Sequence, residues 1–310
     1  MGNKINNMKN QIIIFLVSIV VFSCKNDTET NGKLNVVTTT TMITDLVKNI
    51  GGDSINVQGL MGSGVDPHLY KASEGDVSKL TNADVIFYNG LHLEGKLVEV
   101  FEKMGSATKT PIALADQLDK STLIGSDYFA SNYDPHVWFD INYFGMFADK
   151  IAKVLAEQDL KNAEFYAKNM TSYLTELKTL NEKMSAKIAE LPEDKRILVT
   201  AHDAFNYFGK AYKFEVVGLQ GLSTATEAGV QDVQKLAAFI IEKNTKAIFV
   251  ESSVPKRTIE ALQAAVKSKG HNVEIGGTLY SDALGTTGTI EGTYIGMFEY
   301  NVNTIVNALK

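Results

Sequence analysis

Short apolar runs alternate with helix-like segments from residue 33 to the end of the 310-residue chain, and this alternation restricts the fold more than any other feature. The runs are rich in β-branched residues and too short for helices, so each predicts a buried strand. They are 34–38, 55–61, 85–88, 112–114, 197–200, 216–217, 247–250 and 273–275. Helices are expected at 42–50, 76–80, 97–104, 140–158, 232–243, 256–268 and at the C-terminus. The sequence therefore predicts an α/β protein with mostly parallel sheets flanked by helices.

One longer helix is expected mid-chain, over residues 162–191. Its apolar residues recur every three or four positions, and they form one continuous stripe. They are Tyr166, Met170, Tyr173, Leu174, Leu177, Leu180, Met184, Ile188 and Leu191. At 1.5 Å per residue this helix spans about 45 Å, longer than a small domain, and Pro192 ends it. With about 150 residues per domain, the helix predicts an N-terminal lobe at 33–160, a linking helix at 161–192 and a C-terminal lobe at 193–310. A long surface helix of one domain is the alternative.

Residues 1–23 have the pattern of a signal peptide. Lys4 and Lys9 precede an apolar run at 11–22, which is shorter than the roughly 20 residues of a membrane-spanning helix. The run ends in Val-Phe-Ser before Cys24, as in a bacterial lipobox, so we expect cleavage there and lipid attachment to the thiol. An ordinary secretory signal with an incidental cysteine is the alternative. Residues 24–32 predict a flexible tether, and the protein is expected to be exported and lipid-anchored to the cell envelope, facing the periplasm or the cell surface.

Charge and cysteine content exclude several classes of protein. The formal net charge is −6 and the isoelectric point is about 5.5. Removal of residues 1–23 takes away two lysines and no acid, which lowers the charge to −8. This argues against a nucleic-acid partner, which requires a basic patch. Cys24 is the only cysteine, so a disulfide scaffold and a cysteine-rich zinc or iron–sulfur site are excluded.

Two of the five histidines lie in the same tripeptide, Asp-Pro-His, at His68 and His136. The proline stiffens the backbone and keeps the preceding residue extended, which suits a ligand that must keep one direction. Asp66 and Asp134 stand two residues before these histidines, and each could accept the second ring N–H and fix the tautomer.

Two further candidates lie in the C-terminal half, where His202 and Asp282 both follow predicted strands. Ligands bind at the carboxyl ends of parallel strands in α/β sheets. Three imidazoles and a carboxylate suit a divalent metal such as zinc or manganese, but each histidine could equally cap a helix or hydrogen-bond within the core. His92 could line the mouth of a cleft, and His271 is expected to be solvated.

Six stretches together resemble a known family, and they occur in the family's order. They are Asp66-Pro-His-Leu-Tyr70, ADVIFYNGLHLE at 83–94, Asp134-Pro-His-Val-Trp138, Ala201-His-Asp-Ala-Phe205, Ala247-Ile-Phe-Val-Glu251 and Ser281-Asp-Ala-Leu-Gly285. They are similar to the zinc- and manganese-binding lipoproteins of bacterial ABC importers, the TroA-like cluster of solute-binding proteins. The resemblance covers nearly the whole mature chain. It implies two α/β lobes joined by a rigid helix, with the metal in the cleft between them.

The resemblance also implies the site and its task. The implied ligands are His68, His136, His202 and Asp282, and Glu251 has a supporting role. The protein would bind one divalent metal ion as cargo and deliver it to an ABC permease, as a monomer without enzymatic activity. Zinc is favoured over manganese because three imidazoles are softer than a carboxylate-rich set.

The chain matches neither metal subtype of this family fully. Manganese-binding members often have Glu in place of His202, whereas many zinc-binding members have a histidine-rich loop where residues 115–133 contain no histidine. Two other functions remain as alternatives. A zinc hydrolase would need an open metal position and a base, for which Glu251 is the one attractive candidate, and the sequence has no HExxH motif. An iron-chelate or vitamin-binding protein shares the long helix, and an additional adhesin role is a further possibility.

Overall fold

The computed structural model describes residues 32–105 and 110–310, and Lys33–Lys310 forms one compact unit. The expected signal peptide and Cys24 lie outside the described residues. Within the described ranges, no helix has the length and apolar character needed to cross a bilayer.

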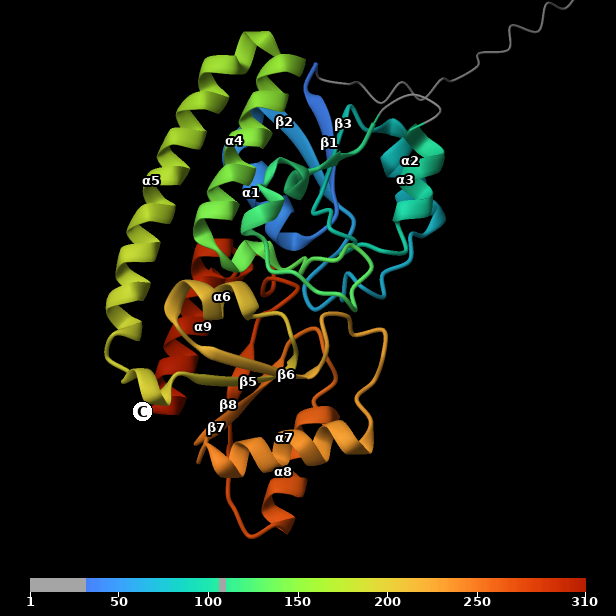
Figure 1. The fold of residues 1–310 in the computed structure, drawn as a ribbon. Helices are drawn as coiled ribbons and strands as arrows, with labels where there is room; N and C mark the ends of the chain where they lie inside the picture. Colours follow the sequence, from blue (N-terminus) through green and yellow to red (C-terminus); the bar gives the residue numbers. More distant parts are fainter. Residues whose placement is uncertain (1–31, 106–109) are drawn as a thin grey trace, which may run out of the picture. The chain divides into compact units, whose positions relative to one another are not determined.

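The N-terminal half builds a four-stranded, fully parallel sheet (Figure 1). Its strands are β1 (Leu34–Thr38), β2 (Ile55–Gly59), β3 (Val85–Tyr88) and β4 (Ile112–Ala113), in the order β2-β1-β3-β4. Its helices are α1 (Thr41–Gly51), α2 (Glu74–Asn82), α3 (Val98–Gly105) and α4 (Ile141–Gln158). The strand order reverses between β1 and β3, and the carboxyl ends of strands at such a point are a preferred place for ligands.

The C-terminal half repeats the parallel βα pattern. Its strands are β5 (Ile197–His202), β6 (Glu215–Gln220), β7 (Ala247–Glu251) and β8 (Glu274–Leu279). Its helices are α6 (Asn206–Tyr212), α7 (Val230–Glu242), α8 (Arg257–Ser268) and α9 (Tyr294–Leu309). Strand β5 pairs with β6, β7 pairs with β8, and β5 lies beside β7. His202 and Glu251, the last residues of β5 and β7, are thereby brought together.

Side chains alternate along the buried strands, so helices cover both faces. Ile248 and Val250 belong to the apolar cluster with α7 and α8, whereas Ala247 and Phe249 belong to the larger cluster that includes α9. This is the arrangement expected for parallel strands with near-continuous apolar sequences. The predicted α/β class with parallel strands flanked by helices is confirmed.

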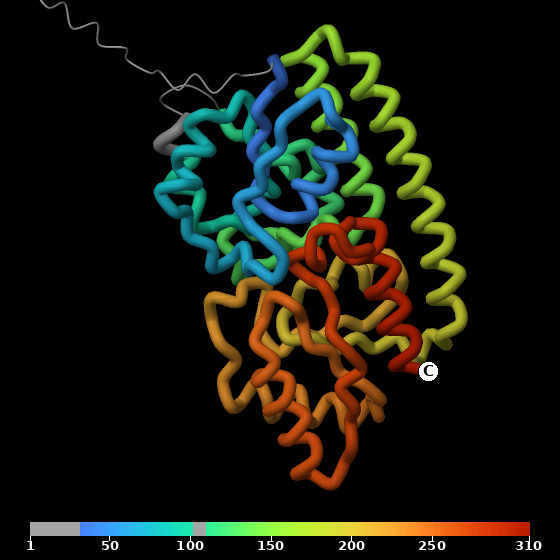
Figure 2. The backbone as a smooth tube through the Cα atoms, turned by 180° about the vertical axis from the view of Figure 1, so that it is seen from behind, coloured from blue at the N-terminus to red at the C-terminus, as the bar shows by residue number. Residues whose placement is uncertain are grey.

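The long helix α5 (Ala163–Ile188) has 26 residues, and at 1.5 Å per residue it spans about 39 Å. It packs against α1 and α4 of the N-terminal half and against α9 of the C-terminal half (Figures 1 and 2). Seven residues of the predicted stripe are buried: Tyr166, Tyr173, Leu177, Leu180, Met184, Ile188 and, just beyond the helix, Leu191. The predicted end at Leu191 was too late, because the chain turns through i→i+3 hydrogen bonds at 190–191 before Pro192. The lobe boundaries at 160 and 192 stay a prediction.

Local chemistry explains where several helices begin. Asp140 caps α4 by accepting the N–H of Asn142, as its position predicted. Ser73 and Asp76 form a capping box at the start of α2. Helix α6 was not predicted, because seven residues are too few to display a helical period.

Candidate metal centre

Four buried side chains converge at the carboxyl ends of strands. His68 lies in the loop between β2 and α2, and His136 precedes the short 3-10 helix Val137–Phe139, which leads into α4. His202 is the last residue of β5, and Asp282 lies just after β8. All four are at most 6% exposed. The fold thus brings together residues separated by as many as 214 positions.

The ligand-capable atoms point at one another. His68 Nε2 lies 3.3 Å from His136 Nε2 and 3.6 Å from Asp282 Oδ2. His136 Nε2 lies 3.7 Å from Asp282 Oδ1, and His202 Nε2 lies 3.2 Å from Asp282 Oδ2. One ligand atom from each residue falls within 4.8 Å of all the others.

These separations suit a single metal ion. A tetrahedron with metal–ligand bonds of 2.0–2.1 Å has edges of about 3.3–3.4 Å, close to the separations between these atoms. Among the described residues, the two carboxylate oxygens of Asp282 and the Nε2 of His202 have no hydrogen-bond partner outside the cluster. Buried polar atoms without partners are costly, and a cation bound between them would remove that cost.

Carboxylates hold the far side of two imidazole rings. Asp134 Oδ1 lies 2.7 Å from His136 Nδ1 and also accepts the main-chain N–H of His136 at 2.9 Å. Glu251 Oε2 lies 2.6 Å from His202 Nδ1, and its Oε1 accepts the main-chain N–H of His202 at 2.8 Å. A proton on Nδ1 leaves the Nε2 lone pair free for a metal. The role predicted for Asp134 and the supporting position of Glu251 both agree with this geometry.

The first Asp-Pro-His motif works differently from the second. Asp66 Oδ1 accepts the main-chain N–H of His68 at 2.8 Å, and its Oδ2 accepts the hydroxyl of Thr224 at 2.5 Å. Both oxygens are therefore occupied by groups other than the imidazole. The expectation that Asp66 would hold the ring N–H of His68 was wrong.

The burial and charge of the cluster shift its pKa values in opposite directions. Burial lowers the pKa of His68 to about 3, against the attraction of Asp282. Burial also opposes charge on His202, but the carboxylates of Glu251 and Asp282 outweigh it and raise the pKa of His202 well above its ordinary value. The pKa of Asp282 lies well below its usual range because the three imidazoles outweigh its burial.

A second group of residues, which the sequence did not single out, fixes the loops of the site. Glu94 is buried, and it accepts the hydroxyl of Thr39, just after β1, at 2.6 Å and the N–H of Asn89, just after β3, at 2.8 Å. The Asn89 amide then donates to the carbonyl of Pro135, directly before His136. Trp138 Nε1 donates to the carbonyl of Ser281, directly before Asp282. The one indication of these residues in the sequence was that they lie within or beside the six family motifs.

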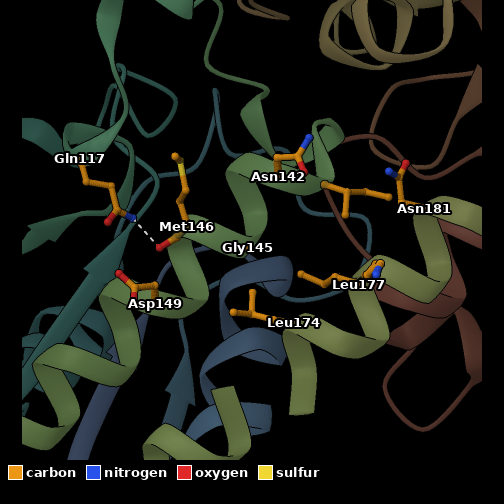
Figure 3. A pocket seen from close by; sticks show the side chains of 10 residues that line it. Gln117, Asn142, Gly145, Met146, Asp149, Leu174, Leu177 and Asn181 are labelled. Carbon is orange, nitrogen blue, oxygen red and sulfur yellow. Dashed lines mark hydrogen bonds between the residues drawn. The ribbon is translucent and has the colours of Figure 1, made fainter. Parts of the chain in front are cut away.

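The remaining histidines lie outside the cluster. His92 is exposed, and its ring contacts Phe129, which also contacts the ring of His68. His271 is half-buried in the segment before β8. A groove of about 560 Å³ between α4 and α5 contains none of the four candidate ligands (Figure 3).

The α/β fold and the buried three-histidine, one-aspartate cluster together define a class of protein that binds a metal ion between strand ends. The family profile described as "ZnuA: Zinc-uptake complex component A periplasmic" matches residues 36–308. The chain is 49% identical over 278 residues to the manganese-binding lipoprotein MntA of Bacillus subtilis, with 90% of each protein covered. It is 46% identical over 283 residues to the zinc-binding protein TroA of Treponema pallidum, with 91% of each covered.

The solved structure of TroA from Treponema pallidum superposes with a TM-score of 0.87, covering 90% of this chain and 99% of that one at 47% identity. The chain therefore belongs to the ZnuA family of metal-binding proteins, and the resemblance inferred from the six motifs is confirmed.

Proposed function

We propose that this protein is the extracytoplasmic metal-binding component of an ABC importer, which captures one divalent transition-metal ion and delivers it to a permease. His68, His136, His202 and Asp282 are the proposed ligands. The observation that carries the proposal is the convergence of three Nε2 atoms on one buried carboxylate. The family membership and the metal-binding names of the relatives support it.

Capture rather than catalysis follows from the donor set. Four protein ligands close the coordination shell of a tetrahedral ion, whereas a catalytic zinc site keeps one position for water. Glu251, the residue that a hydrolase would need as a base, has both oxygens engaged with His202. An iron chelate or vitamin would need a pocket of its own, but the four ligand atoms lie too close together to admit more than an ion.

Zinc is the cargo that we favour over manganese. Three imidazoles form a softer set than one rich in carboxylates, and zinc prefers nitrogen ligands more strongly than manganese does. Relatives named for manganese and for zinc are similarly distant from this chain, so their names do not separate the two metals. Metal analysis of the protein purified from its native host is the deciding measurement, and manganese as the predominant ion would refute this preference.

Export, anchoring and delivery complete the proposal. Cys24 is the proposed lipid attachment site, and residues 24–32 would link the anchored cysteine to the folded unit. The protein would act as a monomer at the cell envelope and pass its ion to the permease. Mass spectrometry of the membrane-extracted protein should find a diacylglycerol on Cys24, and a free thiol there would refute the anchor.

The ligand set can be tested by substituting two of the proposed ligands and, as controls, the two histidines outside the cluster. His68→Ala and Asp282→Ala should each weaken zinc binding by more than about 100-fold, because loss of a mere outer partner of a ligand already costs 10–100-fold. His92→Ala and His271→Ala are the matched controls, since neither side chain belongs to the cluster. Affinity is measured by competition with a chelator of known strength. Unchanged affinity in both ligand variants would exclude this site.

A further inference from the structure

Side chains from the C-terminal half hold both Asp-Pro-His motifs, but in unequal ways. Asp134 Oδ2 accepts the side-chain amide of Asn206 at 3.0 Å, and its carbonyl accepts the hydroxyl of Tyr207 at 3.0 Å. Both donors belong to helix α6. The motif of His136 is thus bound twice to a regular element.

The motif of His68 is bound by a loop instead. The donor to Asp66 is the hydroxyl of Thr224, which lies in the segment Gly221–Gly229 between β6 and α7. Thr224 is 8% exposed, whereas its next three residues are exposed. We call Gly221–Gly229 the β6–α7 loop.

The imidazole ring of His68 is likewise held less firmly than those of His136 and His202. Carboxylates hold the Nδ1 atoms of His136 and His202, but the carboxylate of Asp66 holds only the main chain of His68. His68 also lies in a long irregular connection between β2 and α2, while His136 begins a helical turn. The orientation of His68 therefore depends most on its loop.

Open space lies next to the less firmly held motif of His68. A cavity of about 450 Å³ is lined by the β6–α7 loop and by Phe129, whose ring stands edge-on to that of His68 at 6.4 Å. The loop can move into this space without displacing a packed core, which is what local opening requires.

We propose that the Thr224 hydroxyl is a latch: by holding Asp66 it keeps His68 in its ligating position, and movement of the β6–α7 loop frees His68 and releases the metal ion. Thr224 is a positioning residue, since it reaches the ion through Asp66 and His68. This inference rests on the proposed function and adds the element that controls release.

The test measures the rate of zinc release from the full chain into excess chromophoric chelator by stopped flow. Thr224→Val keeps the shape of the side chain but loses the hydroxyl, and it should release zinc about tenfold faster, since a hydrogen bond to a charged group is lost. Thr224→Ser restores the hydroxyl and should stay within about threefold of the wild-type rate. Thr226→Val, in the same loop, is the matched control and should not change the rate.

A release rate of Thr224→Val equal to that of the wild type would overturn the latch. A Thr224→Ser variant as fast as Thr224→Val would overturn it too, because packing rather than the hydroxyl would then be responsible. Thermal unfolding of the metal-free variants shows whether each is folded, and Thr224→Ala, which also lacks the hydroxyl, replaces the valine variant if that variant does not fold.

A double-mutant cycle tests whether the latch acts through His68. In the His68→Ala background, Thr224→Val should no longer accelerate release, and an acceleration equal to that in the wild type would refute the route through His68. The outcomes also separate the two proposals. A wild-type protein that binds neither zinc nor manganese refutes the proposed function itself, whereas normal binding with a Thr224-independent release rate refutes only the latch.

Discussion

Substitution of Glu251 by glutamine tests whether the carboxylate behind His202 tunes the metal centre. Glu251 is 2% exposed and contacts His202 twice, at the main-chain N–H (2.8 Å) and at Nδ1 (2.6 Å). Glutamine has nearly the same size, but the two groups contact different oxygens of Glu251, and in the same position glutamine replaces one of these oxygens by an NH2 group, which cannot accept. The imidazole therefore loses either its orientation or its acceptor, and in both cases it loses the negative charge that makes it a stronger donor.

The expected loss of metal affinity follows from these contacts. Removal of the outer hydrogen-bond partner of a ligating histidine typically weakens metal binding 10–100-fold, which is about 1.4–2.8 kcal/mol. We expect the upper end of this range, because the contact is buried, charged and made at two atoms. Zinc and manganese affinities of Glu251→Gln and wild type are compared by chelator competition at pH 7.5.

Glu94→Gln is the matched control for this experiment. Glu94 is also 2% exposed, and its Oε1 accepts the Asn89 N–H and the Thr39 hydroxyl. It contacts none of the four proposed ligands and reaches His136 only through Asn89 and Pro135, so its substitution should lower metal affinity less than Glu251→Gln does. The reasoning is refuted if Glu251→Gln binds zinc as tightly as the wild type, or if Glu94→Gln loses as much affinity as Glu251→Gln.

Three further predictions concern pH and packing. Metal affinity should fall by up to about tenfold per pH unit on acidification, because the raised pKa of His202 means that the ion must displace a proton from this histidine. Chelator competition from pH 8 to 6 measures the affinity, and an affinity independent of pH would contradict the prediction. Burial raises the pKa of Asp45, which accepts the Tyr294 N–H, to about 6. The protonated side chain therefore stabilises the fold fully below about pH 4, and this stabilisation, up to about 3 kcal/mol, is lost as the pH rises through 6. Asp45→Asn should therefore gain stability over the wild type at pH 7.5 but not at pH 4 in urea denaturation, and an equal gain at both would contradict the assignment. Gly218→Ala should lose about 1–3 kcal/mol of stability and some metal affinity, because its Cβ would lie 2.5 Å from the main chain of His202, whereas Gly125→Ala, with open space around it, should not.

The sequence predicted the parts of the structure that local pattern and topology determine. The apolar alternation located the strands, with β1 and β3 matched to the residue. Because carboxyl ends of parallel strands meet at one edge, the positions of His202 and Asp282 already implied that they could approach. Their convergence with His68 and His136 needed the family resemblance, since spacing alone left core histidines as an equal alternative.

The contacts missed from sequence are those that join distant segments. The Thr224–Asp66 bond spans 158 residues and the Asn206–Asp134 bond spans 72, and neither donor lies in a local pattern that marks it. The first motif also shows that an identical tripeptide does not determine one use of its aspartate. Asp66 and Asp134 are both followed by Pro-His, but only Asp134 reaches the imidazole.

Charge balance explains why the cluster suits a dication better than either its empty or its proton-filled form. Asp134, Glu251 and Asp282 are buried around three imidazoles, so with neutral rings the centre holds three negative charges in little water. Such a concentration of buried charge is unfavourable unless it is compensated, and against the burial of His202 the carboxylates of Glu251 and Asp282 raise its pKa. A divalent ion would supply two positive charges at the point where the Nε2 atoms and Asp282 meet, while Asp134 and Glu251 keep their places on the Nδ1 side. The carboxylates behind the rings would therefore favour binding without being ligands, because they turn the metal-free state into one that a cation relieves.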